Sequence, residues 1–478
     1  MNVPEGSGVD QEEDLKEVKR LRSGPRRPDL ETLYCIDEDG SHHVIHPADV
    51  RGRFQRIKKA VWTILVVIYV ALPWIRIGGH PAILIDIPRR HFFLFGHTFN
   101  AMDFWLAFFF LAGVGLTLIL LSALYGRVWC GYACPQTVFL EGFYRRIERW
   151  IEGTAPQREK LARSPWTVRK ILKKGGKHFA YLVLSLVLAH VFLSYFIPVR
   201  ELGNVVTSSP AAHPAAFVFV MALTAVMMFN FAWFREQLCL IICPYGRLQS
   251  ILSDPDTIVV GYDARRGEPR GRYNREGRGD CIDCYRCVAV CPTGIDIRFG
   301  LQLECIGCAN CIDACDEVMD KLGQARGLIR NDSLNGFEGR RSRFWRPRVV
   351  AYFSLLALVF GGFVYATSKV EPIEARFVRL PGPAYVIEGG KIRNQFRLRL
   401  LVKEGGPRHV SIEPLSPEGA EFIFSQRDFD LPLLEYREVM TFVSLPRSSF
   451  RQGTAVEVWV RFGEERRTVR APFVGPDD

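Results

Sequence analysis

Eight cysteines in two matching runs limit the fold of this chain more than any other feature. Each run has the spacing C-x2-C-x2-C-x3-C, the first beginning at Cys281 and the second at Cys305. A cubane [4Fe–4S] cluster needs one thiolate for each iron, so three closely spaced cysteines and a more distant fourth suit it. Structural zinc also uses C-x2-C pairs, but a longer loop separates its two pairs. The runs therefore predict two [4Fe–4S] clusters and a protein that carries electrons.

The same spacing predicts which cysteines share a cluster. It is the pattern of bacterial two-cluster ferredoxins, in which the fourth cysteine of each run ligates the other cluster. Pro292 follows the first run, as that pattern requires. We therefore assign cluster 1 to Cys281, Cys284, Cys287 and Cys315, and cluster 2 to Cys305, Cys308, Cys311 and Cys291.

Composition and length favour a multi-domain membrane protein. The 478 residues are 48% hydrophobic and 24% charged, with a formal net charge of +11, and this length suits two to four domains. Basic loops between apolar spans explain the mixture, and no basic segment shows the interleaved aromatic residues of a nucleic-acid-binding module. Thirteen cysteines in so long a chain are not a secreted disulfide scaffold. Residues 1–58 are polar and show no secretory signal pattern.

Five apolar stretches are long enough to cross a bilayer as helices. They lie at 60–79, 104–124, 179–199, 215–234 and 349–367. The alternative, that they are core helices of a soluble protein, is poorly suited to five stretches of this length. His190, in the third stretch, is either a metal or haem ligand or a residue that hydrogen-bonds within the helix bundle.

The distribution of Lys and Arg predicts the orientation of these stretches. Basic residues are frequent at 51–59, 125–178 and 340–348 but rare at 80–103 and 200–214. By the positive-inside rule, the N-terminus and the cysteine runs lie in the cytoplasm, and the C-terminus lies in the periplasm. The cytoplasm also supplies the reducing conditions that cluster thiolates need. We expect a multi-pass protein of the bacterial inner membrane, with the basic loop against anionic lipid.

A second set of four cysteines follows two of the apolar stretches. Each pair reads C-x3-C-P, Cys130 with Cys134 and Cys239 with Cys243. Residues four apart share one face of a helix, and the proline should end each helix at the second cysteine. If the pairs meet, their thiolates favour Cu(I), zinc or iron–sulfur over hard cations. The alternative is that they are small buried residues at helix ends.

Residues 370–478 have the pattern of a β domain. Segments 395–402 and 455–462 alternate apolar and polar residues, and clusters of Gly, Pro and Ser separate such segments. This pattern predicts a β-sandwich of about seven strands. The domain contains no catalytic constellation, so it either binds another periplasmic protein or acts as a stabilising cap.

These features together resemble the FixG-like (CcoG) family over residues 33–475. Its members are accessory proteins of cbb-type cytochrome c oxidase assembly. The resemblance implies an immunoglobulin-like C-terminal domain and a cupric reductase that reduces Cu(II) to Cu(I). It also implies partners among oxidase assembly proteins or copper carriers. One departure from the ferredoxin pattern is Asp316, where a proline would follow the last cysteine.

The expected architecture therefore has five parts. These are a cytoplasmic N-terminal region (1–58), four transmembrane helices (59–248), a ferredoxin domain (249–347), a fifth transmembrane helix (348–368) and a periplasmic immunoglobulin-like domain (370–478). The expected function is to pass electrons from the clusters to a metal, copper by the resemblance, held at Cys130, Cys134, Cys239 and Cys243. Two alternatives stay open: a redox-sensing oxidase assembly factor, and a subunit of a quinol dehydrogenase. The sequence does not identify the electron donor.

Overall fold

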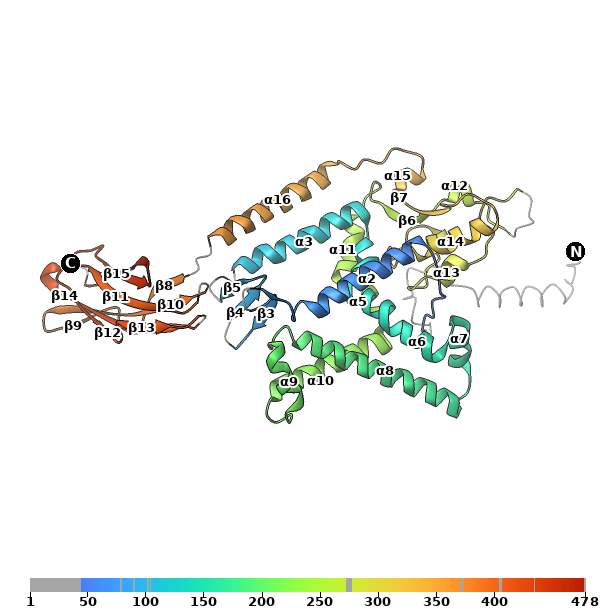
Figure 1. The fold of residues 1–478 in the computed structure, drawn as a ribbon. Helices are drawn as coiled ribbons and strands as arrows, with labels where there is room; N and C mark the ends of the chain where they lie inside the picture. Colours follow the sequence, from blue (N-terminus) through green and yellow to red (C-terminus); the bar gives the residue numbers. More distant parts are fainter. Residues whose placement is uncertain are drawn as a thin grey trace, which may run out of the picture. The chain divides into compact units, whose positions relative to one another are not determined.

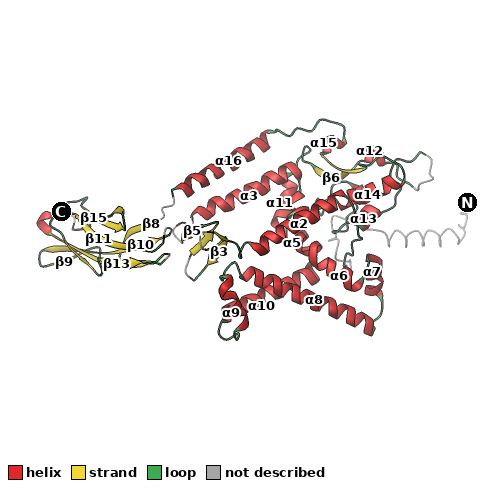
Figure 2. Ribbon diagram, in the orientation of Figure 1, coloured by secondary structure: helices red, strands yellow, loops and turns green. Residues whose placement is uncertain are grey.

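The structure is a computed structural model that folds as two compact units (Figure 1). It describes residues 44–476 except 78, 79, 89, 90, 101, 102, 104, 272–276, 370–372, 404, 405 and 434. The first unit contains the described residues up to Leu72 together with Phe109–Gly361. The second contains Pro73–Phe108 and the residues from Gly362 onward. Figure 2 shows that helices dominate the first unit and strands the second.

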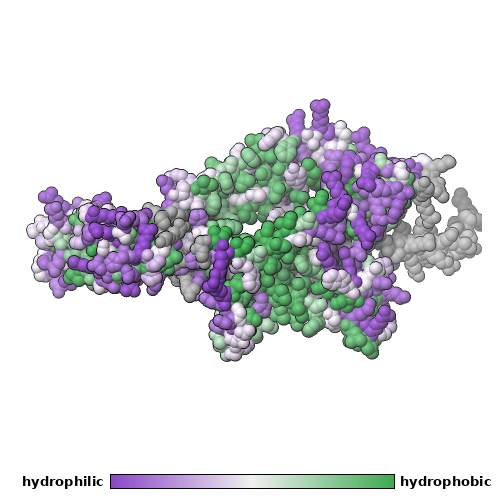
Figure 3. All heavy atoms as spheres, in the orientation of Figure 1, coloured by the Kyte–Doolittle hydropathy of each residue, from purple (hydrophilic) through white to green (hydrophobic). Residues whose placement is uncertain are grey.

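Four helices of the described chain are long and apolar enough to cross a membrane. No more than 33% of the most apolar window of any of them is buried within the protein. Figure 3 shows apolar side chains gathered over these helices, and a continuous apolar surface of this kind needs lipid around it. They match the second to fifth predicted stretches and are α3 (Trp105–Tyr125), α8 (Val168–Leu193), α10 with its π-helical extension η3 (Pro214–Met228, Phe229–Phe234) and α16 (Pro347–Ser368).

The first predicted stretch, 60–79, differs from the structure. Helix α2 spans Arg53–Ala71, and its first two turns carry four basic residues. Its apolar part, 60–71, is about 18 Å long at about 1.5 Å per residue, against about 30 Å of bilayer hydrocarbon. The chain leaves the helix before Pro73, and strand β1 begins at Arg76. The apolar run continues beyond the proline, which is why hydropathy alone placed the helix too late.

The start of α2 is held by the cysteine-rich region. Asp313, in helix α14 (Asn310–Lys321), accepts hydrogen bonds from the backbone N–H groups of Phe54 (3.1 Å) and Gln55 (2.8 Å). These bonds cap amides that the first turn of a helix leaves without partners. A Cβ on Gly52 would collide with the Asp313 side chain, so only glycine fits there.

Short helical segments connect the long helices of the first unit. The two C-x3-C-P motifs lie in these connections rather than in the apolar helices. The segments are α4 (Val128–Tyr132), α5 (Pro135–Phe139), η2 (Leu140–Tyr144), α6 (Arg145–Glu152), α7 (Ala155–Arg163), α9 (Val199–Thr207), η4 (Leu238–Ile242) and α11 (Pro244–Leu252).

The cysteine runs lie in a small α/β region with its own core. Its two strands, β6 (Val259–Tyr262) and β7 (Ile329–Asp332), pair antiparallel. Buried Val260, Ile297, Ile312 and Leu328 pack there with cysteines of both runs. The remaining elements are α12 (Ala264–Gly267), α13 (Arg286–Ala289), η5 (Ile297–Phe299) and α15 (Leu334–Phe337).

The C-terminal part of the second unit is a β-sandwich with nine described strands rather than about seven. One sheet has the order β12-β14-β10-β8, with β9 also paired to β10, and the other has the order β13-β11-β15-β16. Alternate residues of the long strand β10 are buried, as its sequence pattern predicts. The strands are β8 (Ile373–Arg379), β9 (Val386–Glu388), β10 (Lys391–Val402), β11 (Arg408–Ser416), β12 (Glu421–Phe424), β13 (Asp428–Leu431), β14 (Arg437–Pro446), β15 (Ala455–Phe462) and β16 (Glu465–Pro472), with the turn η6 (Arg447–Ser449).

The segment between α2 and α3 forms small sheets that belong to the second unit. A buried ion pair from Lys403 Nζ to Asp103 Oδ2 (2.6 Å) joins this segment to the sandwich, and the ring of His91 stacks on that of Tyr436. The strands are β1 (Arg76–Ile77), β2 (His80–Pro81), β3 (Ile83–Asp86), β4 (His91–Leu94) and β5 (His97–Asn100).

Candidate functional site

The two cysteine runs fold as matching loops. In each run, the residues on both sides of the second cysteine have positive φ: Asp283 and Tyr285 in the first, Gly307 and Ala309 in the second. Such left-handed turns point successive backbone N–H groups toward one concave side, which suits an anionic group. After each turn a helix begins, α13 in the first run and α14 in the second.

The cysteines line two cavities in the sets that the spacing predicts. Cys281, Cys284, Cys287 and Cys315 lie around one cavity. The second cavity is lined by Cys291, Cys305, Cys308 and Cys311, and Cys287 also reaches it. Each cavity therefore offers the four thiols of one predicted set, the number of donors that a [4Fe–4S] cluster requires.

Burial shapes the chemistry of these thiols. It raises the pKa of Cys305 and of Cys315 to about 12, so metal coordination is needed to hold them as thiolates. Cys284 is the exposed member of cluster 1, whereas Cys308 of cluster 2 is buried. Asp316, which replaces the proline of the ferredoxin pattern, accepts a hydrogen bond from the Gly327 N–H (3.0 Å) and so fixes the loop that leads to β7.

The four cysteines of the C-x3-C-P motifs are arranged differently from the prediction. Cys130 lies in α4, but Cys134 has an extended backbone (φ −62°, ψ 127°) and precedes α5. Cys239 lies in the π-helical η4, and Cys243 is again extended before α11. The prediction that each helix ends at the second cysteine is confirmed, because the following proline excludes the helical conformation there. The prediction that each pair shares one helix face is wrong for the same reason.

The two pairs nevertheless come together. Burial, together with the nearby thiols of Cys134, Cys130 and Cys243, raises the pKa of Cys239 to about 12. The pKa of Cys130 is raised to about 12 by the same causes, against the opposing charge of Arg127. No three His, Cys, Asp or Glu side chains in the described part of the chain are placed to hold a single metal ion. The mutual effect of the thiols on their pKa values nevertheless shows that the four are neighbours.

Reciprocal hydrogen bonds hold the two C-x3-C-P segments against each other. Gln136, just after Cys134, donates to the Arg235 carbonyl (2.9 Å) and exchanges hydrogen bonds with Asn230. On the other side of the cysteines, Arg127 donates to the Gly246 carbonyl. Each segment thus anchors the other on both sides of the cysteines.

The loop of the second cysteine run and the first C-x3-C-P segment are in direct backbone contact. A Cβ on Gly131, between Cys130 and Cys134, would lie 2.8 Å from the Cys308 Cα and 2.9 Å from its N. A Cβ on Gly307 would lie 3.1 Å from the backbone of Arg127. These two glycines let the backbones of both sites touch. Arg127 also acts on both sites, since its charge opposes the raised pKa of Cys130 and of Cys305.

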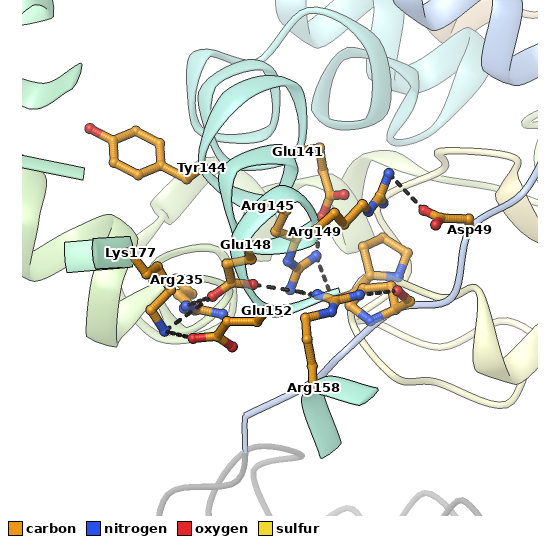
Figure 4. A network of polar contacts seen from close by, with 12 residues as sticks. Asp49, Glu141, Tyr144, Arg145, Glu148, Arg149, Glu152, Arg158, Lys177 and Arg235 are labelled. Carbon is orange, nitrogen blue, oxygen red and sulfur yellow. Dashed lines mark hydrogen bonds and ion pairs between the residues drawn. The ribbon is translucent and has the colours of Figure 1, made fainter. Parts of the chain in front are cut away.

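A network of buried ion pairs braces this contact (Figure 4). Arg145 is 1% exposed, binds Glu141 and Glu236, and donates to the Pro292 carbonyl next to Cys291. Burial raises the pKa of Glu148, but the charges of Arg235 and Lys177 outweigh it and lower the pKa overall. The network connects the ligand loop of cluster 2 to the segment that carries Cys239.

We expect Glu148→Gln to destabilise the first unit strongly. Glu148 is 1% exposed and pairs with Arg158, Lys177 and Arg235. Removing one partner of a buried ion pair costs about 3–5 kcal/mol because the opposite charge is left buried. Glu159→Gln is the control, since its pair with Arg163 is exposed and such pairs contribute about 0–1 kcal/mol. Thermal unfolding of both purified variants checks this, and equal melting temperatures would contradict it.

His190 makes a hydrogen bond within its own helix, from its Nδ1 atom to the Leu186 carbonyl (2.7 Å). This bond fits both interpretations of His190, because metal-ligating histidines also use their second ring nitrogen in this way. Met227 and Met228 of α10 pack against a core cluster around Tyr144 and Phe231.

Three family models and several curated proteins match the chain. The models are a 4Fe-4S dicluster domain at 234–334, a 4Fe-4S binding domain at 106–153, and the IG-like fold at the C-terminus of FixG at 363–476. Protein RdxA of Cereibacter sphaeroides is 38% identical over 383 residues, covering 77% of this chain and 81% of that protein. The chain belongs to the FixG family. Two further members are Protein RdxB of the same organism (38%; 81% of this chain and 85% of that protein) and Nitrogen fixation protein FixG of Rhizobium meliloti (36%; 77% and 78%).

FixG-family membership confirms the iron–sulfur character and the immunoglobulin-like fold predicted from sequence. The protein is a membrane-associated iron–sulfur electron-transfer protein with an IG-like C-terminal domain. Sequence reasoning missed the roles of Gly131, Arg127 and Arg145. The one signal in the sequence was Gly131 itself, because a glycine between two cysteines can mark a place where another backbone segment comes close.

Proposed function

We propose that this protein passes electrons from two [4Fe–4S] clusters to copper at the four C-x3-C-P thiols, reducing Cu(II) to Cu(I) for maturation of a cbb-type cytochrome c oxidase. The observation that carries the proposal is the backbone contact of Gly131 with Cys308. It makes the second cysteine set a direct neighbour of a cluster ligand. An electron acceptor at those thiols would therefore be close to the electron source.

The cysteines of the chain fit both the [4Fe–4S] clusters and copper. Each cavity of the cysteine-run region presents four thiols, and [4Fe–4S] clusters bound there supply one-electron transfer. The Cys130, Cys134, Cys239 and Cys243 thiolates prefer Cu(I) over Cu(II), which favours reduction of a bound Cu(II) ion.

We further propose that α2 completes a five-span topology by crossing the bilayer over its full 19 residues, about 28 Å, with the long Arg and Lys side chains of its first turns reaching the headgroup region. Its start is bonded to Asp313 of the cysteine-rich region, and the residues after it belong to the second unit. The basic residues at that start and those at 125–178 and 340–348 place the cluster region in the cytoplasm by the positive-inside rule. The immunoglobulin-like domain would then be periplasmic and available to oxidase assembly proteins or copper carriers. A redox-sensing assembly factor and a quinol dehydrogenase subunit are the competing functions.

A second candidate for the C-x3-C-P site is a third iron–sulfur group. The match of a 4Fe-4S binding domain to 106–153 favours it, because that range includes Cys130 and Cys134 but neither cysteine run. Iron content separates the two candidates: two cubanes contain about eight irons and three contain about twelve.

The proposed path predicts that Gly131→Ala slows copper reduction without loss of clusters. The added Cβ would press on the backbone of Cys308, so the two sites must move apart. The rate of electron transfer falls as donor and acceptor move apart, so we expect Cu(II)-dependent cluster reoxidation to be slower than in the wild type.

Gly142→Ala is the matched control for this variant. Gly142 is also buried, but its added Cβ would meet only the Trp62 ring at 3.6 Å, an ordinary contact. Stopped-flow absorbance of dithionite-reduced protein mixed with Cu(II) measures both variants. If Gly131→Ala had normal iron content and reduced Cu(II) at the wild-type rate, the contact of Gly131 with Cys308 would not be part of the electron-transfer path.

A further inference from the structure

A cavity of about 330 Å3 lies in the first unit against the point where the two thiol sites meet. Gly131 and Cys308 form part of its wall, and the start of α2 and helix α6 form other parts. This volume is within the about 300–1,000 Å3 range of small-molecule sites. The proposed copper chemistry uses the C-x3-C-P thiols, which do not line this cavity. It therefore assigns no role to the cavity.

The walls of the cavity are basic and aromatic. Lys58, Lys59 and Arg146 contribute cations, Arg149 contributes a guanidinium group already paired with Asp49 (2.7 Å), and Trp62 and Trp150 contribute indole rings. The Lys58 Nζ atom donates to the Asn310 side-chain oxygen, a neutral partner. The cavity's acidic residue, Glu141, is already paired with Arg145 (Figure 4). The charge of the walls therefore suits an anion.

Two side chains carry polar atoms that lack partners. Trp62 is 5% exposed, and its indole Nε1 has no hydrogen-bond partner among the described residues. The same holds for the buried Oε1 atom of Gln55. Leaving a buried polar group unpaired costs about 1–3 kcal/mol. One unused donor and one unused acceptor beside indole rings fit a planar heteroaromatic ligand with both kinds of group.

We propose that this cavity binds a flavin phosphate as the electron donor to the adjacent cluster. The inference rests on the proposed function, because it names the source of the electrons that reach copper. Lys59 and Arg146 would bind the phosphate, and Trp62 and Gln55 would contact the isoalloxazine ring. Indole rings stack well on such a ring.

The electron count of this donor matches the carriers. The anionic reduced flavin loses two electrons and its N5 proton to become oxidised flavin, and the proton goes to water. One electron is taken up at the Cys305 set and the other at the Cys281 set, since each [4Fe–4S] cluster accepts one. A neutral membrane quinol has no anionic group for these lysines and arginines to bind.

The test uses full-length, cluster-loaded protein in detergent and oxidised flavin mononucleotide as the probe. We expect saturable binding of one flavin per chain, measured by quenching of flavin fluorescence and by equilibrium dialysis. Lys59→Gln and Arg146→Gln should each weaken binding by about tenfold through loss of one charge-assisted hydrogen bond. Riboflavin, which lacks the phosphate, should bind about tenfold more weakly than the phosphate form.

Arg56→Gln is the control, because Arg56 lies on the same basic start of α2 but does not line the cavity. Its flavin affinity should be unchanged. Equal weakening by Arg56→Gln, or no saturable binding to protein with full iron content, would overturn the proposal. So would displacement of flavin by phosphatidylglycerol vesicles or by a short-chain quinol, since the cavity would then serve lipid or quinol.

A second measurement separates this proposal from the proposed function. Photoreduced flavin mononucleotide should reduce the clusters of the wild type faster than those of Lys59→Gln. Dithionite bypasses the cavity, so dithionite-reduced Lys59→Gln should still transfer electrons to Cu(II) at the wild-type rate. Loss of Cu(II) reduction with intact flavin binding would refute the copper chemistry and leave the flavin site in place.

Discussion

Cys315→Ser is expected to remove one cluster and spare the other. Cys315 belongs to the second run, but its side chain lines the cavity of Cys281, Cys284 and Cys287. Serine is a poor iron ligand, so iron should fall from about eight to about four per chain, the content of one cubane. Electron paramagnetic resonance of the reduced variant should show the spectrum of a single cluster.

Cys291→Ser is the reciprocal variant for this prediction. Cys291 belongs to the first run but lines the cavity of Cys305, Cys308 and Cys311. The two variants should lose different signals. If Cys315→Ser lost the cluster built on Cys305 instead, the crossed assignment would be wrong.

Cys239→Ser is expected to abolish most copper reduction while leaving both clusters intact. Cys239 is near the other three thiols of the C-x3-C-P site but lines neither cluster cavity. Loss of one soft ligand should reduce the rate of Cu(II)-dependent cluster reoxidation by about tenfold or more, the scale seen for losses around metal sites. Cluster absorbance and iron content should remain at wild-type values.

Cys35→Ser is the control for Cys239→Ser, because Cys35 is the one cysteine of the chain outside every motif. It should reduce copper at the wild-type rate. Loss of clusters in Cys239→Ser would instead make the C-x3-C-P cysteines cluster ligands, as in the three-cluster alternative. An unchanged rate of copper reduction in Cys239→Ser would mean that the C-x3-C-P cysteines are only buried residues at helix ends. That result would favour the assembly-factor function.

The sequence predicted those features that depend on local spacing. The cysteine runs bend as matching loops because the positions around Cys284 and Cys308 adopt the same left-handed turns. The alternation at 395–402 reappears as the buried and exposed faces of β10. In both cases the structure depends on the conformation of a few residues that are neighbours in the sequence, so a local sequence pattern predicts it.

Features that depend on distant packing were not predictable. Hydropathy began the first span at residue 60 and extended it past Pro73 to residue 79, because the basic residues that start α2 at Arg53, under the Asp313 cap, are not apolar. Helical periodicity put each C-x3-C-P pair on one helix face, although the proline makes the second cysteine extended. The contact of Gly131 with Cys308 joins residues far apart in the chain, and no local pattern encodes it.

We propose that electrons stored at the cysteine runs reduce copper at the C-x3-C-P thiols. An anaerobic single turnover tests this: dithionite-reduced wild-type protein, freed of excess reductant, is mixed with Cu(II) plus a Cu(I)-specific chromophore. We expect cluster absorbance to recover as Cu(I) appears, with about two Cu(I) formed per chain from two one-electron clusters. Cluster reoxidation no faster than in buffer without Cu(II), or reoxidation without any Cu(I), would contradict it.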